Sequence, residues 1–428
     1  ADTALVMLAG VYYGAEYGGS IASILLNIPG TPSASVTCLD GYPMARQGRA
    51  GVALFMTAIA SFCGGIFGVI VMTLLSPALA RFALLFGPAE YFSVMVLGLI
   101  AASVVSSSGA IRGVAMVCLG VLLGTVGVDT NSGDVRFTGG IQELRDGVSL
   151  VVVAMGLFGV SEVIVSARGK IPSYATEKIP FRSFLPTASE AVRSIGPVLR
   201  GSSIGSFFGT LPGTGQTVAS FVGYALEKRM SKNRDQFGKG AIEGIMVPES
   251  ANNAAAQTAF IPTLTLGIPG STTMALMLGA LMIHGINPGP RLLTDHPELF
   301  WGLVVSFMFG NLFLLVLNIP LIGLWVRLLR VPHIYLYPTV VVLICVGVYS
   351  IDNSVFDIWV TLVFGAIGYI LRLYKFEPAP LLIGFVLGPM MEEFFRRAML
   401  LSRGDPFVFF DRPGSAVLLI SSAVLFIW

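Results

Sequence analysis

The chain is a succession of long apolar runs separated by short polar links. Most runs are close to the roughly 17 to 25 residues that a membrane-spanning helix needs. The pattern therefore predicts an all-α, polytopic membrane protein embedded in a lipid bilayer. The runs lie at residues 50–76, 89–105, 110–127, 148–165, 299–326, 334–349 and 354–371, with a shorter run at 378–391 and a partial one from Pro413.

Two similar stretches interrupt this pattern, NIPGTP at residues 27–32 and GIPGST at residues 267–272. Residues 28–30 of the first match residues 268–270 of the second at a constant offset. Because proline donates no backbone hydrogen bond and glycine relaxes the backbone, each stretch should break a helix. Paired breaks in two halves of a membrane protein indicate a transporter's binding site. We predict two transmembrane repeats of inverted topology, residues 1–190 and 191–428.

A third break, LPGTG, interrupts the apolar residues 201–226, and basic segments flank it on both sides. Each arm of about 11 residues would reach roughly 16 Å, about half of the membrane core. The residues favour a re-entrant hairpin that enters from the cytoplasm, although a single broken crossing also fits the total length. The basic residues 168–200 are the expected cytoplasmic link between the halves.

The first repeat shows one break and the second shows two. If the repeat is complete in the natural protein, roughly fifty or more residues with another Pro-Gly break precede Ala1.

The composition fits a membrane protein and excludes several other classes. Hydrophobic residues make up 54% of the chain and charged residues 12%, against roughly 25% charged in soluble domains. A net charge of +2 gives no reason to expect a nucleic-acid partner. The four cysteines and three histidines lie far apart without ligand spacing, so neither a disulfide framework nor a transition-metal site is expected.

The breaks also carry candidate chemistry for a carboxylate. A dehydrated anion can take hydrogen bonds from the unpaired N–H groups where a helix begins, and hydroxyl or amide side chains follow each break. The candidate substrate ligands are Asn27, Gly30, Thr31, Ser33, Ser35, Pro212, Gly213, Thr214, Gln216, Asn252, Asn253, Gly270, Ser271, Thr272 and Thr273.

A coupling cation would need oxygen ligands, which broken helices supply through their open carbonyls. The candidate ligands for Na⁺ are Asn27, Ile28, Asn253, Gly267 and Ile268. A proton is the alternative, with Glu16 and Asp40 as the acidic residues nearest the first break. No cofactor beyond this coupling ion is expected.

Five motifs in one order resemble the large membrane subunit of the tripartite tricarboxylate transporters: GAEYGGS (14–20), ILLNIPG (24–30), DGYPMA (40–45), PESANN (248–253) and LGIPGS (266–271). The resemblance covers essentially the whole chain, except that the family's first apolar arm and its Pro-Gly break are missing. It implies a multi-pass permease of the bacterial inner membrane that takes up citrate-like or other carboxylates on a cation gradient. The implied partners are a small membrane subunit and a periplasmic solute-binding protein.

Two other functions compete with this interpretation. An intramembrane enzyme would need a positioned nucleophile and base or paired carboxylates, and the chain contains no His-Glu-x-x-His or Gly-x-Gly-Asp motif. A passive anion channel would rely on rings of charge or carbonyls in an oligomer. The sequence does not choose among carboxylates, between elevator and rocking motions, or among oligomeric states.

Overall fold

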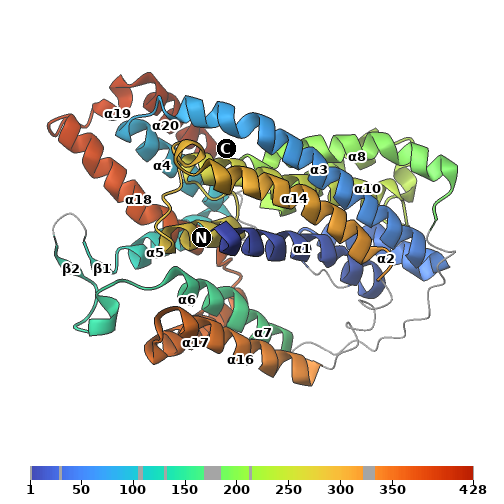
Figure 1. Cartoon of the computed structure of the whole chain (residues 1–428), viewed down its shortest axis with the longest axis horizontal. Coiled ribbons are helices and arrows are strands. Elements are labelled where there is room, and N and C mark those ends of the chain that lie inside the picture. The colour runs from blue at the N-terminus through green and yellow to red at the C-terminus, as the bar shows by residue number, and fades with distance from the viewer. Residues whose placement is uncertain are drawn as a thin grey trace. The chain divides into compact units, whose positions relative to one another are not determined.

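The computed structural model describes residues 2–27, 31–104, 109–129, 133–167, 185–211, 215–321 and 333–427. This part of the chain is almost entirely helical (Figure 1). Its only strands are β1 (Gly127–Val128) and β2 (Val135–Arg136), which pair antiparallel in the polar loop after α5. The predicted all-α class is confirmed.

The helices follow the apolar runs closely. Among the described residues, Ser35–Arg81, Pro297–Asn318 and Val355–Leu373 are long and apolar enough to cross a membrane, and six shorter apolar helices accompany them. These features are those of a multi-pass membrane protein. The helices are α1 (Asp2–Leu26), α2 (Ser35–Met44), α3 (Ala50–Ala83), α4 (Pro88–Val104), α5 (Ala110–Gly124), α6 (Leu150–Ala154), α7 (Ser161–Ala167), α8 (Ala188–Gly209), α9 (Gly215–Met230), α10 (Glu243–Thr258), α11 (Phe260–Leu266), α12 (Thr272–Ile283), α13 (Leu292–Asp295), α14 (Pro297–Asn318), α16 (His333–Asp352), α17 (Val355–Leu373), α18 (Ala379–Leu401), α19 (Val408–Asp411) and α20 (Pro413–Ile427), with π-helical turns at Ala45–Arg49 and Met155–Val160 and 3-10 turns at Gln142–Leu144 and Arg234–Gln236.

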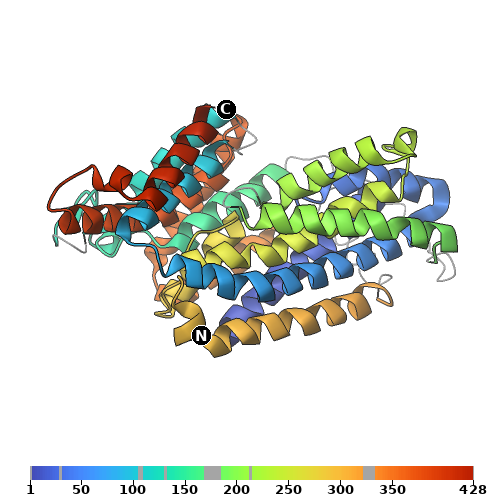
Figure 2. The ribbon, with the colours of Figure 1, turned by 90° about the horizontal axis from the view of Figure 1, so that it is seen from above.

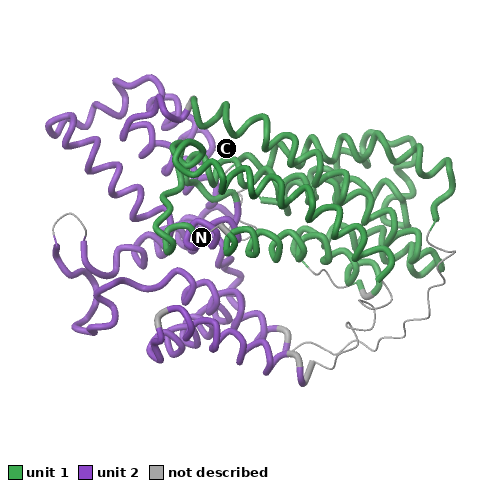
Figure 3. The backbone as a smooth tube through the Cα atoms, viewed as in Figure 1, with its two compact units in different colours: residues 1–81, 173–270, 281–331 green, residues 82–172, 271–280, 332–428 purple. Residues whose placement is uncertain are grey.

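The chain divides into two compact units (Figure 3). The first contains residues 1–81, 173–270 and 281–331, and the second contains residues 82–172, 271–280 and 332–428. Each unit draws on both predicted repeats, so this division does not test them, and the repeats at residues 1–190 and 191–428 stay a prediction.

The first unit is built around α10, whose every residue is buried. Helices α1, α2, α8, α9 and α11 pack against it, and Figures 1 and 2 show α8 and α10 running alongside each other. A helix buried on all sides is usually apolar, but α10 carries the sequence EGIMVPESANNAAAQT. Its polar side chains are therefore the unusual feature of this unit.

Small residues allow the neighbouring helices to approach α10 closely. On α8, a Cβ atom built at Gly201, Gly205 or Gly209 would lie within 2.6 Å of an α10 backbone carbonyl oxygen or side-chain hydroxyl. On α3, a Cβ at Gly64 would lie 2.3 Å from the carbonyl oxygen of Ser250. Glycines spaced four apart form one face of a helix, and such faces bring membrane helices into backbone contact.

In the second unit, α18 packs against α4 and α5, and α17 packs against α7 and the π-helical turn Met155–Val160. Arg136, in the loop after α5, binds Asp129 and Glu392, and Arg396 binds the same two carboxylates. Hydrogen bonds and charge from these carboxylates raise the pKa of the Arg136 guanidinium above its usual value, and Glu392 has the larger effect. The cluster ties the polar loop to α18.

Two acidic segments that lie outside the apolar runs of the sequence are also helical. The apolar run at 378–391 continues in α18 through Glu392 and Glu393 to Leu401. Ion pairs from Glu392 to Arg396 and from Glu393 to Arg397, four residues apart, support the additional turns. Asp40, which precedes the first apolar run, lies inside α2 and is fully buried.

The third break forms a helical hairpin of α8 and α9 rather than a single broken crossing. Arg200 on α8 makes two hydrogen bonds to Glu227 on α9, at 2.7 and 2.8 Å, so the helices run antiparallel. The arms are longer than predicted because α8 begins at Ala188, where Thr187 and Glu190 form a capping box. Residues 212–214 at the tip lie outside the described residues.

Asp40 anchors α2 to the segment before α10. Its Oδ1 accepts the backbone N–H groups of Gly238, Gly240 and Ala241, each at 2.8 Å, and its Oδ2 accepts the Tyr224 hydroxyl at 2.9 Å. Four donors occupy this carboxylate, which explains why an acidic residue is tolerated without exposure to water.

Replacing Asp40 with alanine should therefore destabilise the protein by about 2 to 4 kcal/mol, because several buried donors lose their acceptor. The measurement is thermal unfolding of the purified protein in detergent. Asp235→Ala, an exposed acidic residue near the same segment, should leave the melting temperature unchanged. Equal melting temperatures for both variants would contradict the anchoring role.

Candidate functional site

Both predicted Ile-Pro-Gly breaks occur where a helix ends in a left-handed residue. Asn27, which follows α1, has φ 56°, and Gly267, which ends α11, has φ 71°. Glycine and asparagine are the residues that adopt this conformation at helix ends most readily. These two positions also correspond in the sequence repeat, and the repeat itself stays a prediction. Ile28 and Gly30 lie outside the described residues.

After the first break, a chain of hydroxyls leads back to α1. Thr31 and Ser33 share a hydrogen bond of 2.9 Å, and Ser33 donates to the carboxylate of Glu16 at 3.1 Å. Ser35 instead donates to the Pro32 carbonyl at the start of α2. Of these predicted substrate ligands, Thr31 and Ser33 therefore face the partly buried carboxylate of Glu16, whereas Ser35 closes a local turn.

The α8–α9 hairpin reaches the same helix one turn earlier. Gln216, in the first turn of α9, donates to the hydroxyl of Tyr12. The Tyr12 ring lies 6.1 Å from the ring of Phe260 on α11. The hairpin and the first break thus meet α1 at neighbouring turns.

The second break lies against the same hairpin. A Cβ atom at Gly270 would lie 3.4 Å from the carbonyl oxygen of Gly209, at the end of α8. Just before it, the Ile268 N–H donates to the Pro262 carbonyl at 3.2 Å. Ser271, Thr272 and Thr273 belong to the second unit, where Ser271 caps α12 by accepting the Met274 N–H at 3.3 Å.

Helix α10 adds buried polar side chains to this region. Asn252 and Gln257 are at most 1% exposed, and neither makes a side-chain hydrogen bond of ordinary geometry. Asn253 donates to the Glu249 carbonyl at 2.9 Å, but its Oδ1 is unpartnered. Unpartnered buried amides cost free energy, so each one needs an explanation such as water, an ion or a ligand.

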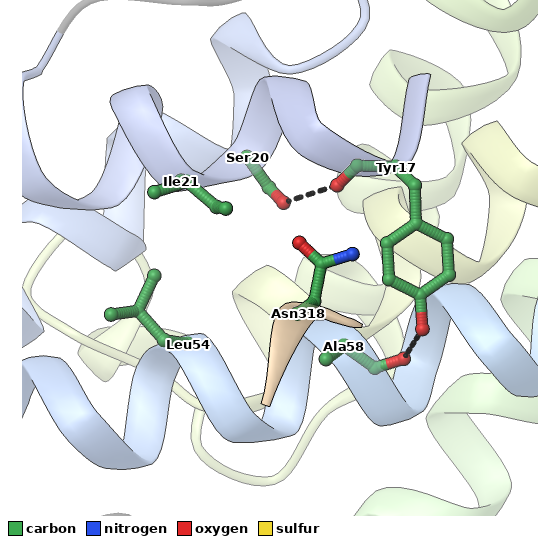
Figure 4. A pocket seen from close by; sticks show the side chains of 6 residues that line it. All are labelled: Tyr17, Ser20, Ile21, Leu54, Ala58 and Asn318. Atoms are coloured by element: carbon green, nitrogen blue, oxygen red, sulfur yellow. Dashed lines mark hydrogen bonds between the residues drawn. The ribbon is translucent and has the colours of Figure 1, made fainter. Parts of the chain in front are cut away.

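The polar face of α1 completes the site. Tyr13 donates to Asn311 of α14 at 2.5 Å, and Tyr17 donates to the Ala58 carbonyl of α3 at 2.6 Å. Figure 4 shows the Tyr17 side chain and Asn318 beside a small pocket. The pocket's free volume of about 10 Å³ is near that of a single water molecule. The pocket is lined by Tyr17, Ser20, Ile21, Leu54, Ala58 and Asn318.

Several residues of this site were missed by the sequence analysis. Glu249 lies in a quoted motif, but no role was assigned to it, and Tyr12, Tyr13, Gln257 and Asn311 were not considered. One signal was available, because an ionisable residue inside an apolar helix of a membrane protein is a functional candidate by default. Residues 212–214, also predicted to bind substrate, lie outside the described residues.

Comparisons with known proteins agree with the resemblance found in the motifs. The family model "Tripartite tricarboxylate transporter TctA family" matches residues 1–383. The chain is 48% identical over 417 residues to an uncharacterized 52.8 kDa protein in the TAR-I ttuC' 3'region of Agrobacterium vitis, covering 97% of this chain and 83% of that protein. It is 55% identical over 215 residues to an uncharacterized protein in the TAR-II ttuC' 3'region of the same organism, covering 50% of this chain and 89% of that protein. No solved structure matches.

Proposed function

Because the chain belongs to the tripartite tricarboxylate transporter TctA family, we propose that it is the large permease subunit of a binding-protein-dependent secondary transporter for citrate-like or related carboxylates. Its proposed partners are a small membrane subunit and a periplasmic solute-binding protein, in the bacterial inner membrane. The family is one of transporters, which agrees with the expectation that the chain is not an enzyme.

One observation carries the proposal. The fully buried helix α10 presents the amides of Asn252 and Gln257, which make no hydrogen bond of ordinary geometry among the described residues, and both Ile-Pro-Gly breaks and the α8–α9 hairpin lie in its unit. A polar cavity at broken helices is where a membrane protein tolerates unpaired backbone groups. The hydroxyls of Thr31 and Ser33, the amides of Gln216, Asn252 and Asn253, and the N–H groups at Gly270 would bind the carboxylate groups.

The remaining proposals follow from the repeat. Inverted repeats would allow alternating access, with one repeat-derived part moving against the other around a fixed site. The coupling cation is proposed to be Na⁺, held by open backbone carbonyls at the two breaks and by Asn27 and Asn253, with a proton as the alternative.

The test is uptake of labelled citrate into proteoliposomes that contain this chain, its small subunit and the binding protein. We expect saturable uptake that needs the binding protein and falls to background without an inward cation gradient. Asn27→Ala and Asn253→Ala should each reduce uptake. Flux that rises linearly with concentration and ignores the gradient would instead identify a passive anion channel. Rejection of citrate with uptake of another carboxylate would change only the substrate.

A further inference from the structure

Glu249 is a buried carboxylate whose hydrogen-bond donors are two hydroxyls. Its side chain is 1% exposed and lies at the centre of α10. One oxygen accepts the hydroxyl of Thr37 on α2, and the other accepts the hydroxyl of Ser61 on α3 at 3.2 Å. None of the ion pairs among the described residues involves Glu249.

Glu16 is a second carboxylate in the same region, and the two interact electrostatically. Glu16 accepts the Ser33 hydroxyl and likewise takes part in no ion pair among the described residues. Glu249 in turn acts electrostatically on Tyr17 on α1 and Cys38 on α2, and neither of these groups carries a positive charge.

Two ionised carboxylates without a counter-ion are strongly unfavourable in this setting. Removing the Glu249 carboxylate from water costs several kcal/mol after relaxation, and repulsion from the partly buried Glu16 adds to that cost. Buried acidic residues inside membrane proteins are rare and mark ion pathways or proton relays. The pair should therefore bind at least one positive charge.

An independent observation points to a ligand at this position. The amide of Asn252 lies beside the Glu16 carboxylate, yet neither its Oδ1 nor its Nδ2 makes a hydrogen bond of ordinary geometry, and the residue is 1% exposed. One position along α10, the Oδ1 of Asn253 is also unpartnered and buried. Amide oxygens beside carboxylates are hard ligands suited to a small cation.

We propose that Glu16 and Glu249, with the amide of Asn252, form a site for one monovalent cation, either Na⁺ or a proton. This site keeps Glu16, which was a proton candidate from sequence beside Asp40, and differs from the backbone carbonyls at the breaks, which were the sequence candidates for Na⁺. Asp40 does not belong to it, because four donors from its own chain already occupy that carboxylate.

The site would explain coupling, a consequence that rests on the proposed function. The predicted substrate ligands Thr31, Ser33 and Asn252 adjoin Glu16, so an anionic substrate would be repelled while the carboxylate pair stays charged. A bound cation neutralises part of that charge and favours the anion. By linkage, the anion then favours the cation by the same factor.

The experiment measures cation binding directly on the transporter purified in detergent. One arm follows binding of radioactive sodium, and the other follows the proton uptake of the wild type in excess of that of a Glu16→Gln/Glu249→Gln double variant when the pH falls from about 8 to about 6. We expect the wild type to bind in one of the two arms, which identifies the cation. Glu249→Gln and Glu16→Gln should each weaken that binding by roughly tenfold or more, about 1.4 kcal/mol. Glu143→Gln, an exposed residue of a 3-10 turn, is the matched control and should bind like the wild type.

Retention of wild-type binding by both glutamine variants, or absence of binding to the wild type in both arms, overturns the proposal. Thermal unfolding confirms that each variant is folded, and each glutamate tests the site separately if the other variant fails to fold. Carboxylate uptake by the wild type is measured in parallel. If the wild type takes up carboxylate but neither substitution affects cation binding, the proposed function stands and this cation site is wrong. If the wild type binds the cation through these residues but takes up no carboxylate, the cation site stands and the proposed function is wrong.

Discussion

Replacing Gly205 with valine should leave almost no folded protein. A single Cβ atom at this position would lie 2.1 Å from the carbonyl oxygen and 2.7 Å from the Cα of Ala251. Both are backbone atoms of α10, which is buried on every side and cannot retreat. Overpacking typically costs about 1 to 3 kcal/mol where side chains can yield, and here two helices would have to separate.

Replacing Gly205 with alanine tests the same contact through the sign of the change in stability. In an exposed helix, alanine is about 1 kcal/mol more favourable than glycine. At Gly205 the clash should reverse that sign and lower the melting temperature. The measurement is the yield of monodisperse protein in detergent together with its thermal unfolding curve.

Gly302 on α14 is the matched control, because it is exposed and a Cβ atom there would meet nothing within 4 Å. Both its alanine and valine variants should fold with near wild-type yield. If Gly205→Val melts within a few degrees of the wild type, α8 and α10 are not in backbone contact, and the assembly of the first unit described here is wrong.

The helices of this fold could be predicted from sequence because a run of apolar residues long enough for the bilayer leaves a chain few other conformations. The apolar runs do not predict helices at polar residues whose hydrogen bonds come from distant parts of the chain instead of from water. Asp40 lies outside the apolar runs, but backbone donors at Gly238, Gly240 and Ala241, about two hundred positions away, allow it to be a buried helical residue. Glu392 follows the apolar run at 378–391, and its ion pair with Arg396, four residues on in the same helix, supports the continued helix.

Part of the candidate site could likewise be predicted from sequence, and part could not. Proline and glycine inside an apolar pattern disrupt helices locally, so the breaks at Asn27 and Gly267 could be found from sequence. The partners of Glu249 could not, because Thr37 is 212 positions away in the chain and Ser61 is 188 positions away. Local patterns carry no information on which turns of α1, α2, α3 and α10 come together.

Replacing Asn252 with alanine should reduce carboxylate uptake by roughly a hundredfold, about 2.7 kcal/mol in the transition state, with little loss of stability. The amide is buried and makes no hydrogen bond of ordinary geometry, so the fold gains little from it. A polar group that the fold does not satisfy is expected where function requires it. Uptake into proteoliposomes and thermal unfolding, measured on one preparation, test both halves of this prediction.

Asn311 on α14 provides a control with the opposite pattern. It accepts the hydroxyl of Tyr13 at 2.5 Å and donates to the Phe307 carbonyl at 3.0 Å, and Asn311 and Tyr13 are both buried. Asn311→Ala leaves the Tyr13 hydroxyl without an acceptor, which costs about 1 to 3 kcal/mol. The melting temperature should therefore fall more in this variant than in Asn252→Ala.

The comparison separates a binding residue from a structural one. If Asn252→Ala unfolds as early as Asn311→Ala, the Asn252 amide stabilises the bundle and its place among the substrate ligands is lost. If Asn252→Ala is stable and transports normally, the unpartnered amides of α10 serve neither fold nor transport. A variant that stays stable but loses uptake is the one result that fits a binding site here. In such a site the amides of α10 lack hydrogen bonds within the protein and are therefore available to bind a dehydrated ligand.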